Sequence, residues 1–178
     1  MMTLSIQLVK ASTKWQAAFP SMKKKIEQAA AAAFLNGKKP AAFDKRAFEI
    51  TVVLADDKMI KNLNHDFRGK NMPTNVLSFP QFNMAKFRKT ILDDFSKKEE
   101  IPLGDVVLAF ETIKRESRLE KKKLESHVLH LVIHGVLHLL GYDHMNDKDA
   151  KKMEKMECDI LETLGYPDPY NEPESKKR

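Results

Sequence analysis

Three histidines lie within eleven residues, in the segment His-Gly-Val-Leu-His-Leu-Leu-Gly-Tyr-Asp-His that runs from His134 to His144. His134 and His138 are four residues apart, so on a helix their imidazoles share one face, one turn apart. Gly141 is expected to end this helix, and the turn that follows can bring His144 back to the other two. Three imidazoles at three corners of a tetrahedron leave the fourth corner open, as in catalytic zinc sites. The spacing therefore predicts a metal site formed by His134, His138 and His144.

The residue after the first of these histidines is Gly135, whereas zinc peptidases with the H-E-x-x-H motif have a glutamate there as general base. A peptidase interpretation therefore lacks its base. A metal-bound water needs another activator or none, because zinc alone lowers the pKa of bound water to about 7. Asp143 is the nearest carboxylate and a candidate catalytic residue. It can orient a ligand imidazole or accept a proton, or it can simply be a turn residue.

The histidine stripe extends toward the start of the same predicted helix. His127, His130, His134 and His138 are spaced three, four and four residues apart, which places them within about a quarter of the helix circumference. A lone helical histidine is more often packed or solvated than a ligand, so His127 and His130 can be polar residues at the rim of a buried face. Alternatively, His130 lies beside the metal and contacts a ligand imidazole or the substrate.

A second polar segment, from Asn62 to Pro80, offers groups that could bind a phosphate. Arg68 stands where a helix should end, and its charge can simply complement the helix dipole. The alternative is a guanidinium held toward a phosphate with two parallel hydrogen bonds. Thr74 and Ser78 could bind phosphates or cap turns. His65 is expected at the surface, because the predicted metal already has three ligands.

The chain has 178 residues, of which 42% are hydrophobic, enough for one domain with an ordinary core. Its one cysteine, Cys158, excludes an internal disulfide and fits a packing role. Residues 1–10 contain no long apolar stretch, so we expect no signal peptide, no membrane contact and a cytoplasmic location. The net charge of +6 includes three basic runs, which either form solvated faces or bind a polyanion: Lys23–Lys25, Lys121–Lys123 and Lys176–Arg178.

Strands that alternate with helices predict an α+β domain in which about five helices cover a small mixed four-stranded sheet. The expected strands are Thr3–Val9, Phe48–Leu54, Asn75–Phe79 and Gly104–Phe110. The expected helices are Met22–Leu35, a helix capped by Asp56 that runs to Phe67, Glu111–Leu119, Leu124–Leu140 and Asp147–Leu164. Residues 83–100 are expected to be a polar surface excursion. Residues 1–170 should form a single metal-dependent hydrolase domain that frays after Pro167, with residues 171–178 as a flexible tail.

These motifs together resemble the YbeY family of bacterial endoribonucleases. The family pattern H-G-x-L-H-L-x-G-Y-D-H is matched from His134 to His144 at every fixed position. The pattern F/Y-R-G-K-D-x-P-T-N/D-V-L-S-F-P is matched from Phe67 to Pro80, with Asn71 in place of the usual Asp. Leu103–Asp105 and Leu164–Tyr170 also fit family motifs, so the resemblance covers most of the chain.

The resemblance implies a zincin-like metal site in which His134, His138 and His144 hold zinc or another divalent ion, with Arg68 as the important residue that is not a ligand. It implies cleavage of single-stranded RNA in 16S rRNA 3′-end maturation and in quality control of the 30S subunit. The implied partners are RNA, the 30S subunit and ribosome-associated proteins, and no DNA. Two rivals stay open from the residues alone: a metallohydrolase of peptides or small molecules, and a non-catalytic RNA-binding assembly factor. The nucleophile also stays open between the ribose 2′-hydroxyl and water.

Overall fold

The structure is a computed structural model that describes residues 2–86, 92–93, 95, 99–144 and 146–171. Its strands are β1 (Thr3–Lys10), β2 (Ala47–Ala55), β3 (Val76–Pro80) and β4 (Glu100–Ala109). Its α-helices are α1 (Phe19–Asn36), α2 (Asp57–Arg68), α3 (Phe110–Leu119), α4 (Leu124–Leu139) and α5 (Asp147–Thr163). Short 3-10 turns in the described part of the chain include η1 (Thr13–Trp15), η2 (Ala41–Phe43) and η3 (Met84–Lys86).

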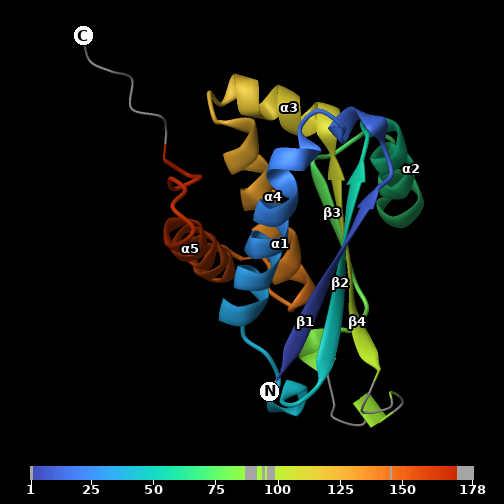
Figure 1. Cartoon of the computed structure of the whole chain (residues 1–178), viewed down its shortest axis with the longest axis vertical. Coiled ribbons are helices and arrows are strands. Elements are labelled where there is room, and N and C mark those ends of the chain that lie inside the picture. Colours follow the sequence, from blue (N-terminus) through green and yellow to red (C-terminus); the bar gives the residue numbers. More distant parts are fainter. Residues whose placement is uncertain (1, 87–91, 94, 96–98, 145, 172–178) are drawn as a thin grey trace.

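The four strands form one mixed sheet in the order β1-β2-β4-β3 (Figure 1). β1, β2 and β4 are parallel, and β3 runs antiparallel to β4 at the edge of the sheet. α1, α4 and α5 lie on one face, and α2 lies on the other (Figure 1). This arrangement confirms the predicted α+β fold with a mixed four-stranded sheet, and α4 packs against both β3 and β4.

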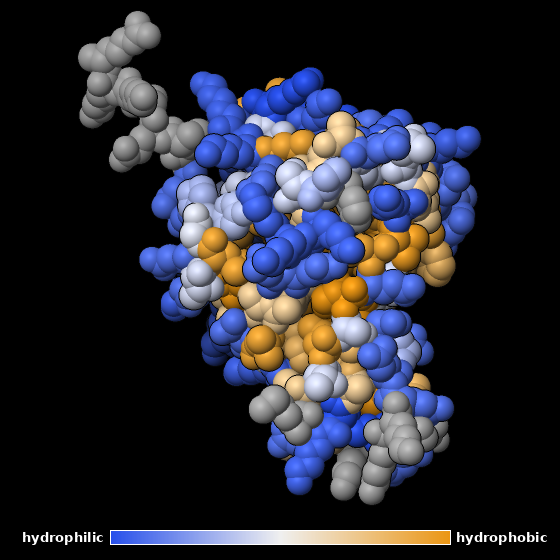
Figure 2. Space-filling view, viewed as in Figure 1, coloured by the Kyte–Doolittle hydropathy of each residue, from blue (hydrophilic) through white to orange (hydrophobic). Residues whose placement is uncertain are grey.

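The main core lies between the sheet and the helices α1 and α4. Alternate residues of β2 point into it, because successive side chains of a strand face opposite sides of the sheet: Phe48, Ile50, Val52 and Leu54. Burial of each of these side chains contributes roughly 1.5–3 kcal/mol to the free energy of folding. A smaller cluster lies under α2 on the other face, around Ile60, Leu77 and Val107. In Figure 2, hydrophilic residues cover the upper part and the edges of this side of the molecule, and hydrophobic residues form a band across its middle.

Several predicted boundaries were wrong by a few residues. α1 begins at Phe19, not Met22, because Pro20 occupies its first turn, where the missing N–H is not needed. β4 begins at Glu100, not Gly104, so the first residues of the strand were missed. Gly104 adopts a φ of 131° next to a shift in the pairing with β2, so the strand runs through a bulge at the glycine where it was expected to begin.

The predicted surface excursion at residues 83–100 falls partly outside the described residues. In the part that is described, Leu92 is buried and Phe95 packs against the main core, so this part is not a purely polar loop. The carbonyl of Phe95 also accepts a hydrogen bond from the guanidinium of Arg46, at 3.1 Å. Among the described residues, no helix has the length and apolar composition needed to cross a bilayer.

The prediction that the chain frays after Pro167 was wrong. Pro169 is buried, and the backbone N–H of Tyr170 donates to the carboxylate of Asp168 at 2.8 Å. The hydroxyl of Tyr170 donates to Glu157 of α5. Local sequence suggested a loose end, whereas a long-range contact with α5 holds this segment. Most of the predicted tail, residues 172–178, lies outside the described residues.

Candidate metal centre

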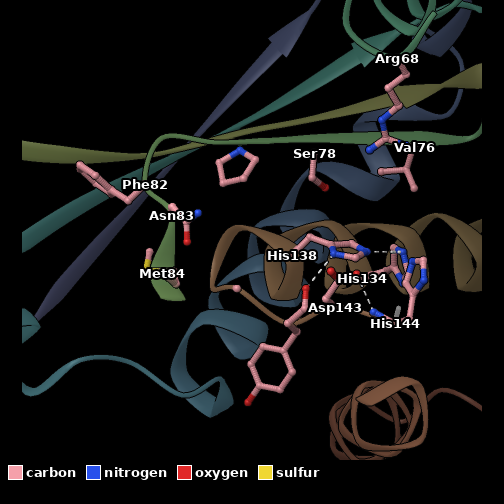
Figure 3. A pocket seen from close by; sticks show the side chains of 13 residues that line it. Arg68, Val76, Ser78, Phe82, Asn83, Met84, His134, His138, Asp143 and His144 are labelled. Carbon is pink, nitrogen blue, oxygen red and sulfur yellow. Dashed lines mark hydrogen bonds between the residues drawn. The ribbon is translucent and has the colours of Figure 1, made fainter. Parts of the chain in front are cut away.

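The three predicted metal ligands lie together at the end of α4 (Figure 3). One nitrogen from each of His134, His138 and His144 can be chosen so that all lie within 4.8 Å of one another. Gly141 adopts a φ of 85°, and its N–H donates to the carbonyl of His138 at 3.0 Å. Because glycine takes this left-handed conformation without steric cost, the helix ends here and the chain turns back toward its own last turn. His144 is brought to the pair in this way.

Hydrogen bonds orient the two helical imidazoles. Nδ1–H of His134 donates to Oε1 of Glu157 at 2.8 Å, and Nδ1–H of His138 donates to the carbonyl of Tyr142 at 2.9 Å. In the neutral form of each ring the proton is then on Nδ1, so both Nε2 atoms carry a lone pair. These two Nε2 atoms face each other at 3.1 Å. Two lone pairs this close repel unless a cation lies between them.

The donor set fits a metal ion. Zn–N bonds of about 2.0–2.1 Å in a tetrahedron place two ligand nitrogens about 3.3 Å apart, near the observed separation of the two Nε2 atoms. Burial, together with the neighbouring His134 and His144, lowers the pKa of His138 to about 4. His138 is therefore a neutral imidazole at neutral pH, which is the form that binds metals.

Glu157 is the residue at this site that sequence reasoning missed. It is 0% exposed, and its Oε1 accepts from His134. Its Oε2 accepts from Nε2–H of His130 at 2.8 Å and from the hydroxyl of Tyr170. Burial alone would favour the protonated carboxyl, but the hydrogen bonds from His130 and His134 lower the pKa of Glu157 to about 2. The carboxylate is thus charged, buried and shared between His134, a predicted metal ligand, and His130.

A signal for Glu157 was present in the sequence. Met153, Met156 and Ile160 form the apolar stripe of α5, and Glu157 interrupts that stripe on its buried side. A charged residue on a buried face needs partners, because an unpaired buried charge is strongly unfavourable. His130, left open between a rim residue and a neighbour of the metal ligands, is joined to His134 through this carboxylate.

Replacing Glu157 by glutamine is expected to lower zinc affinity by about 10- to 100-fold, the usual effect of removing a hydrogen-bond partner of a ligand imidazole. The glutamine NH₂ group would face the N–H of His134 or of His130, where only an acceptor fits. Competition with a chromogenic chelator measures the affinity. The matched control is Glu154→Gln, an exposed position one turn earlier in α5. Equal affinities of the two variants would show that Glu157 does not orient the ligand.

Gly135 has a packing role that explains the missing glutamate. A Cβ at this position would lie 2.5 Å from Cγ1 of Val106 and 3.2 Å from the hydroxyl of Ser78. The hydroxyl of Ser78 also donates to the carbonyl of Gly135 at 3.1 Å. Position 135 therefore faces the sheet, and α4 lies too close to β3 and β4 for any side chain there. The predicted alternatives for Ser78 were a phosphate contact or a turn cap, and its observed partner is the backbone of α4.

A cleft of about 800 Å³ opens beside the histidines. It is lined by the three histidines, by Arg68 from α2, by Ser78 from β3 and by Asp143 (Figure 3). Asp143 is exposed, and its carboxylate accepts from the backbone N–H of His144 at 2.7 Å. This contact is the one expected of a turn residue. A catalytic role for Asp143 stays a prediction.

Arg68 is the last residue of α2, and its side chain reaches the cleft (Figure 3). The loop that follows is held in place by Asn64, which is buried and donates from Nδ2 to the carbonyl of Met72 at 2.8 Å. The N–H of Lys70 donates back to the carbonyl of Asn64 at 3.2 Å. Arg68 is exposed, so its guanidinium is accessible from the cleft. Its place at a helix C-terminus is also compatible with a dipole role.

The remaining histidines are not near the proposed ligands. His65 is exposed and lies 3.0 Å from Asp66, as expected of a surface residue. His127 is only 5% exposed, so it lies deeper than the rim. Its Nε2 is 2.9 Å from Glu116 of α3, and Glu116 also accepts from the side chain of Asn75 at 3.0 Å. His127 therefore joins α4 to α3 and to the start of β3.

Sequence comparisons with known proteins agree on one family. A family model described as Endoribonuclease YbeY matches residues 10–165 of the chain. A Paramagnetospirillum magneticum protein named Endoribonuclease YbeY is 48% identical over 132 residues, which cover 70% of this chain and 72% of that protein. A Rhizobium etli protein of the same name is 43% identical over 141 residues, covering 79% and 77%. A solution structure of a Thermotoga maritima protein, 23% identical, aligns over 98% of this chain and all of its own length with a TM-score of 0.51, which supports the fold.

Proposed function

Because this chain belongs to the YbeY endoribonuclease family, we propose that it is a zinc-dependent endoribonuclease that cleaves single-stranded RNA in the cytoplasm. Its proposed role is maturation of the 3′ end of 16S rRNA and quality control of the 30S subunit, with ribosome-associated proteins as further partners. The proposal rests on the Nε2 atoms of His134 and His138, which face each other at 3.1 Å in a cleft that Arg68 also lines.

His134, His138 and His144 would hold the ion, and residues 1–170 would form the one catalytic domain. A bound divalent metal would polarise a phosphoryl oxygen or lower the pKa of a bound water. Glu157 and the carbonyl of Tyr142 keep the imidazole protons on Nδ1, away from the site. The guanidinium of Arg68 binds a non-bridging phosphate oxygen and stabilises the charge that develops during cleavage. Asp143, exposed at the cleft, is the candidate to accept a proton.

The proposal is tested by incubating the zinc-loaded protein with a labelled single-stranded RNA, a duplex and a DNA strand of the same sequence. Only the single-stranded RNA should be cleaved. Activity should disappear with a chelator and return with zinc. Cleavage of casein without cleavage of RNA would favour a peptidase instead. Tight RNA binding without any cleavage would favour an assembly factor. A single 2′-deoxy substitution at the cut site then identifies the nucleophile, because continued cleavage there rules out attack by the 2′-hydroxyl.

Arg68→Ala is expected to lower kcat/KM for RNA by about 10²- to 10³-fold, since it removes a charged donor from the developing charge. Arg68→Lys should restore only part of the activity, because lysine keeps the charge but loses the two-pronged geometry. Zinc content should not change in either variant, since Arg68 is not a proposed ligand. Lys61→Ala, exposed in the same helix, is the control. Full activity of Arg68→Ala would remove this residue from the mechanism.

A further inference from the structure

The segment that follows α5, residues 166–170, is bonded to both helices that meet at the metal centre, and we call it the strap. The hydroxyl of Tyr166 donates to Glu125 in the first turn of α4 at 2.8 Å. The carboxylate of Asp168 accepts from the thiol of Cys158 in α5 at 3.3 Å. These two contacts join the strap to α4 and to α5, so its last residue is held in a fixed place beside both helices.

That last residue is Tyr170, which meets the buried carboxylate of Glu157. Its hydroxyl donates to Oε2 of Glu157, and Nε2–H of His130 donates to the same oxygen at 2.8 Å. The hydroxyl also lies 3.3 Å from Nε2 of His130, and the two rings meet edge to face with their centroids 5.4 Å apart. Two donors, one from α4 and one from the strap, therefore hold one oxygen of this carboxylate.

Holding Oε2 also fixes the direction of the other oxygen. The last torsion of a glutamate side chain has only a broad preference, so hydrogen bonds decide how its planar carboxylate is turned. With Oε2 bonded to His130 and Tyr170, Oε1 faces Nδ1–H of His134 at 2.8 Å. Glu157 is 0% exposed, so bulk water does not compete for either oxygen. Loss of one donor frees the carboxylate to turn, which weakens its bond to His134.

We propose that Tyr170 and His130 are positioning residues of the metal centre. They hold the carboxylate of Glu157 so that its Oε1 keeps the imidazole of His134 turned with Nε2 toward the other two histidines. Neither residue belongs to the group of three histidines that could hold the ion. The inference rests on the part of the proposed function that places an ion at those histidines. It assigns His130, which the sequence left open, to the support of a ligand and not to the substrate.

The test compares two changes of tyrosine to phenylalanine in the strap. Tyr170→Phe removes the hydroxyl that reaches Glu157 and keeps the ring. It is expected to lower zinc affinity by about fivefold, which is less than the loss of a direct partner of a ligand imidazole causes. Tyr166→Phe is the matched control, because its hydroxyl is bonded to Glu125 and not to Glu157. Competition with a chromogenic chelator measures both affinities. An unchanged affinity of Tyr170→Phe, or equal losses in the two variants, would overturn the inference.

A double-variant cycle distinguishes positioning from a general loosening of the fold. In a protein that already carries Glu157→Gln the carboxylate is absent, so adding Tyr170→Phe should lower zinc affinity by less than about twofold. His130→Phe removes the other donor and should behave in the same way. Its ring site accepts an apolar ring, because Nδ1 of His130 is buried and has no hydrogen-bond partner among the described residues. Losses as large as those in the wild-type background would contradict a role through Glu157.

The zinc-free protein gives a readout that involves neither metal nor RNA. In ¹H–¹⁵N spectra, Nδ1–H of His134 should exchange with water faster in Tyr170→Phe than in the wild type, because its acceptor is less firmly held. Equal exchange rates would refute the positioning role. If exchange and zinc affinity change as expected but the wild type cleaves no RNA, the proposed function fails and the positioning role stands. A wild-type protein that binds no zinc would remove the metal centre and this inference with it.

Discussion

His138→Ala is expected to lower zinc affinity by more than about 100-fold and to abolish RNA cleavage. The loss of affinity should exceed the usual effect of removing a hydrogen-bond partner of a ligand, because a ligand itself is removed. The reason is geometric. His138 supplies one of the two Nε2 atoms that face each other at 3.1 Å, and His134 with His144 cannot close the site without it. Zinc content after dialysis and single-turnover cleavage of a labelled RNA measure the two effects.

Thermal unfolding gives a readout that does not depend on activity. A ligand at about 1,000 times its Kd stabilises the folded protein by about 4 kcal/mol, so zinc should raise the unfolding midpoint of the wild type but not of His138→Ala. His65→Ala is the control, because His65 is an exposed histidine outside the cleft. Retention of zinc-dependent cleavage by His138→Ala would exclude the proposed ligand set.

Gly135→Ala is expected to destabilise the protein by about 1–3 kcal/mol, the usual range for overpacking. Its new Cβ would meet Cγ1 of Val106 at 2.5 Å and Cγ2 at 3.0 Å, so α4 must move away from β4. For a chain of this length the unfolding midpoint should fall by roughly 2–12 °C. Zinc affinity should fall as well, because His134 precedes the displaced residue.

A double variant tests this explanation. Val106→Ala removes the two methyl groups that the new Cβ would meet, so adding it to Gly135→Ala should cost less than the two single changes together. Strict additivity of the two unfolding free energies would contradict the packing argument. Gly135→Glu should be more destabilising than Gly135→Ala and should not produce a peptidase, because position 135 faces the sheet and not the metal centre. Casein hydrolysis by a folded Gly135→Glu protein would contradict this view of the missing base.

The sequence by itself determined the features that depend on nearby residues. The four-residue spacing of His134 and His138 decides that they share a helix face, and Gly141 decides where the helix stops. Both are properties of a few consecutive residues, so pattern alone predicted the histidine cluster that the structure brings together. The alternation of strands and helices predicted the mixed sheet for the same reason. The family motifs then added what no spacing could, namely an expected substrate.

Only the tertiary structure decided which distant residues serve the site. Glu157 lies 23 residues after His134, and the contact between them depends on how α5 packs against α4. The segment ending at Tyr170 was expected to fray, but the hydroxyl of Tyr170 donates to Glu157 of α5. From the sequence, Gly135 stood out because a glutamate base is missing at this position. The structure shows that the glycine allows α4 to approach β4. These contacts join elements that are far apart in the chain. A hydrophobic pattern within one element does not predict how closely that element packs against another.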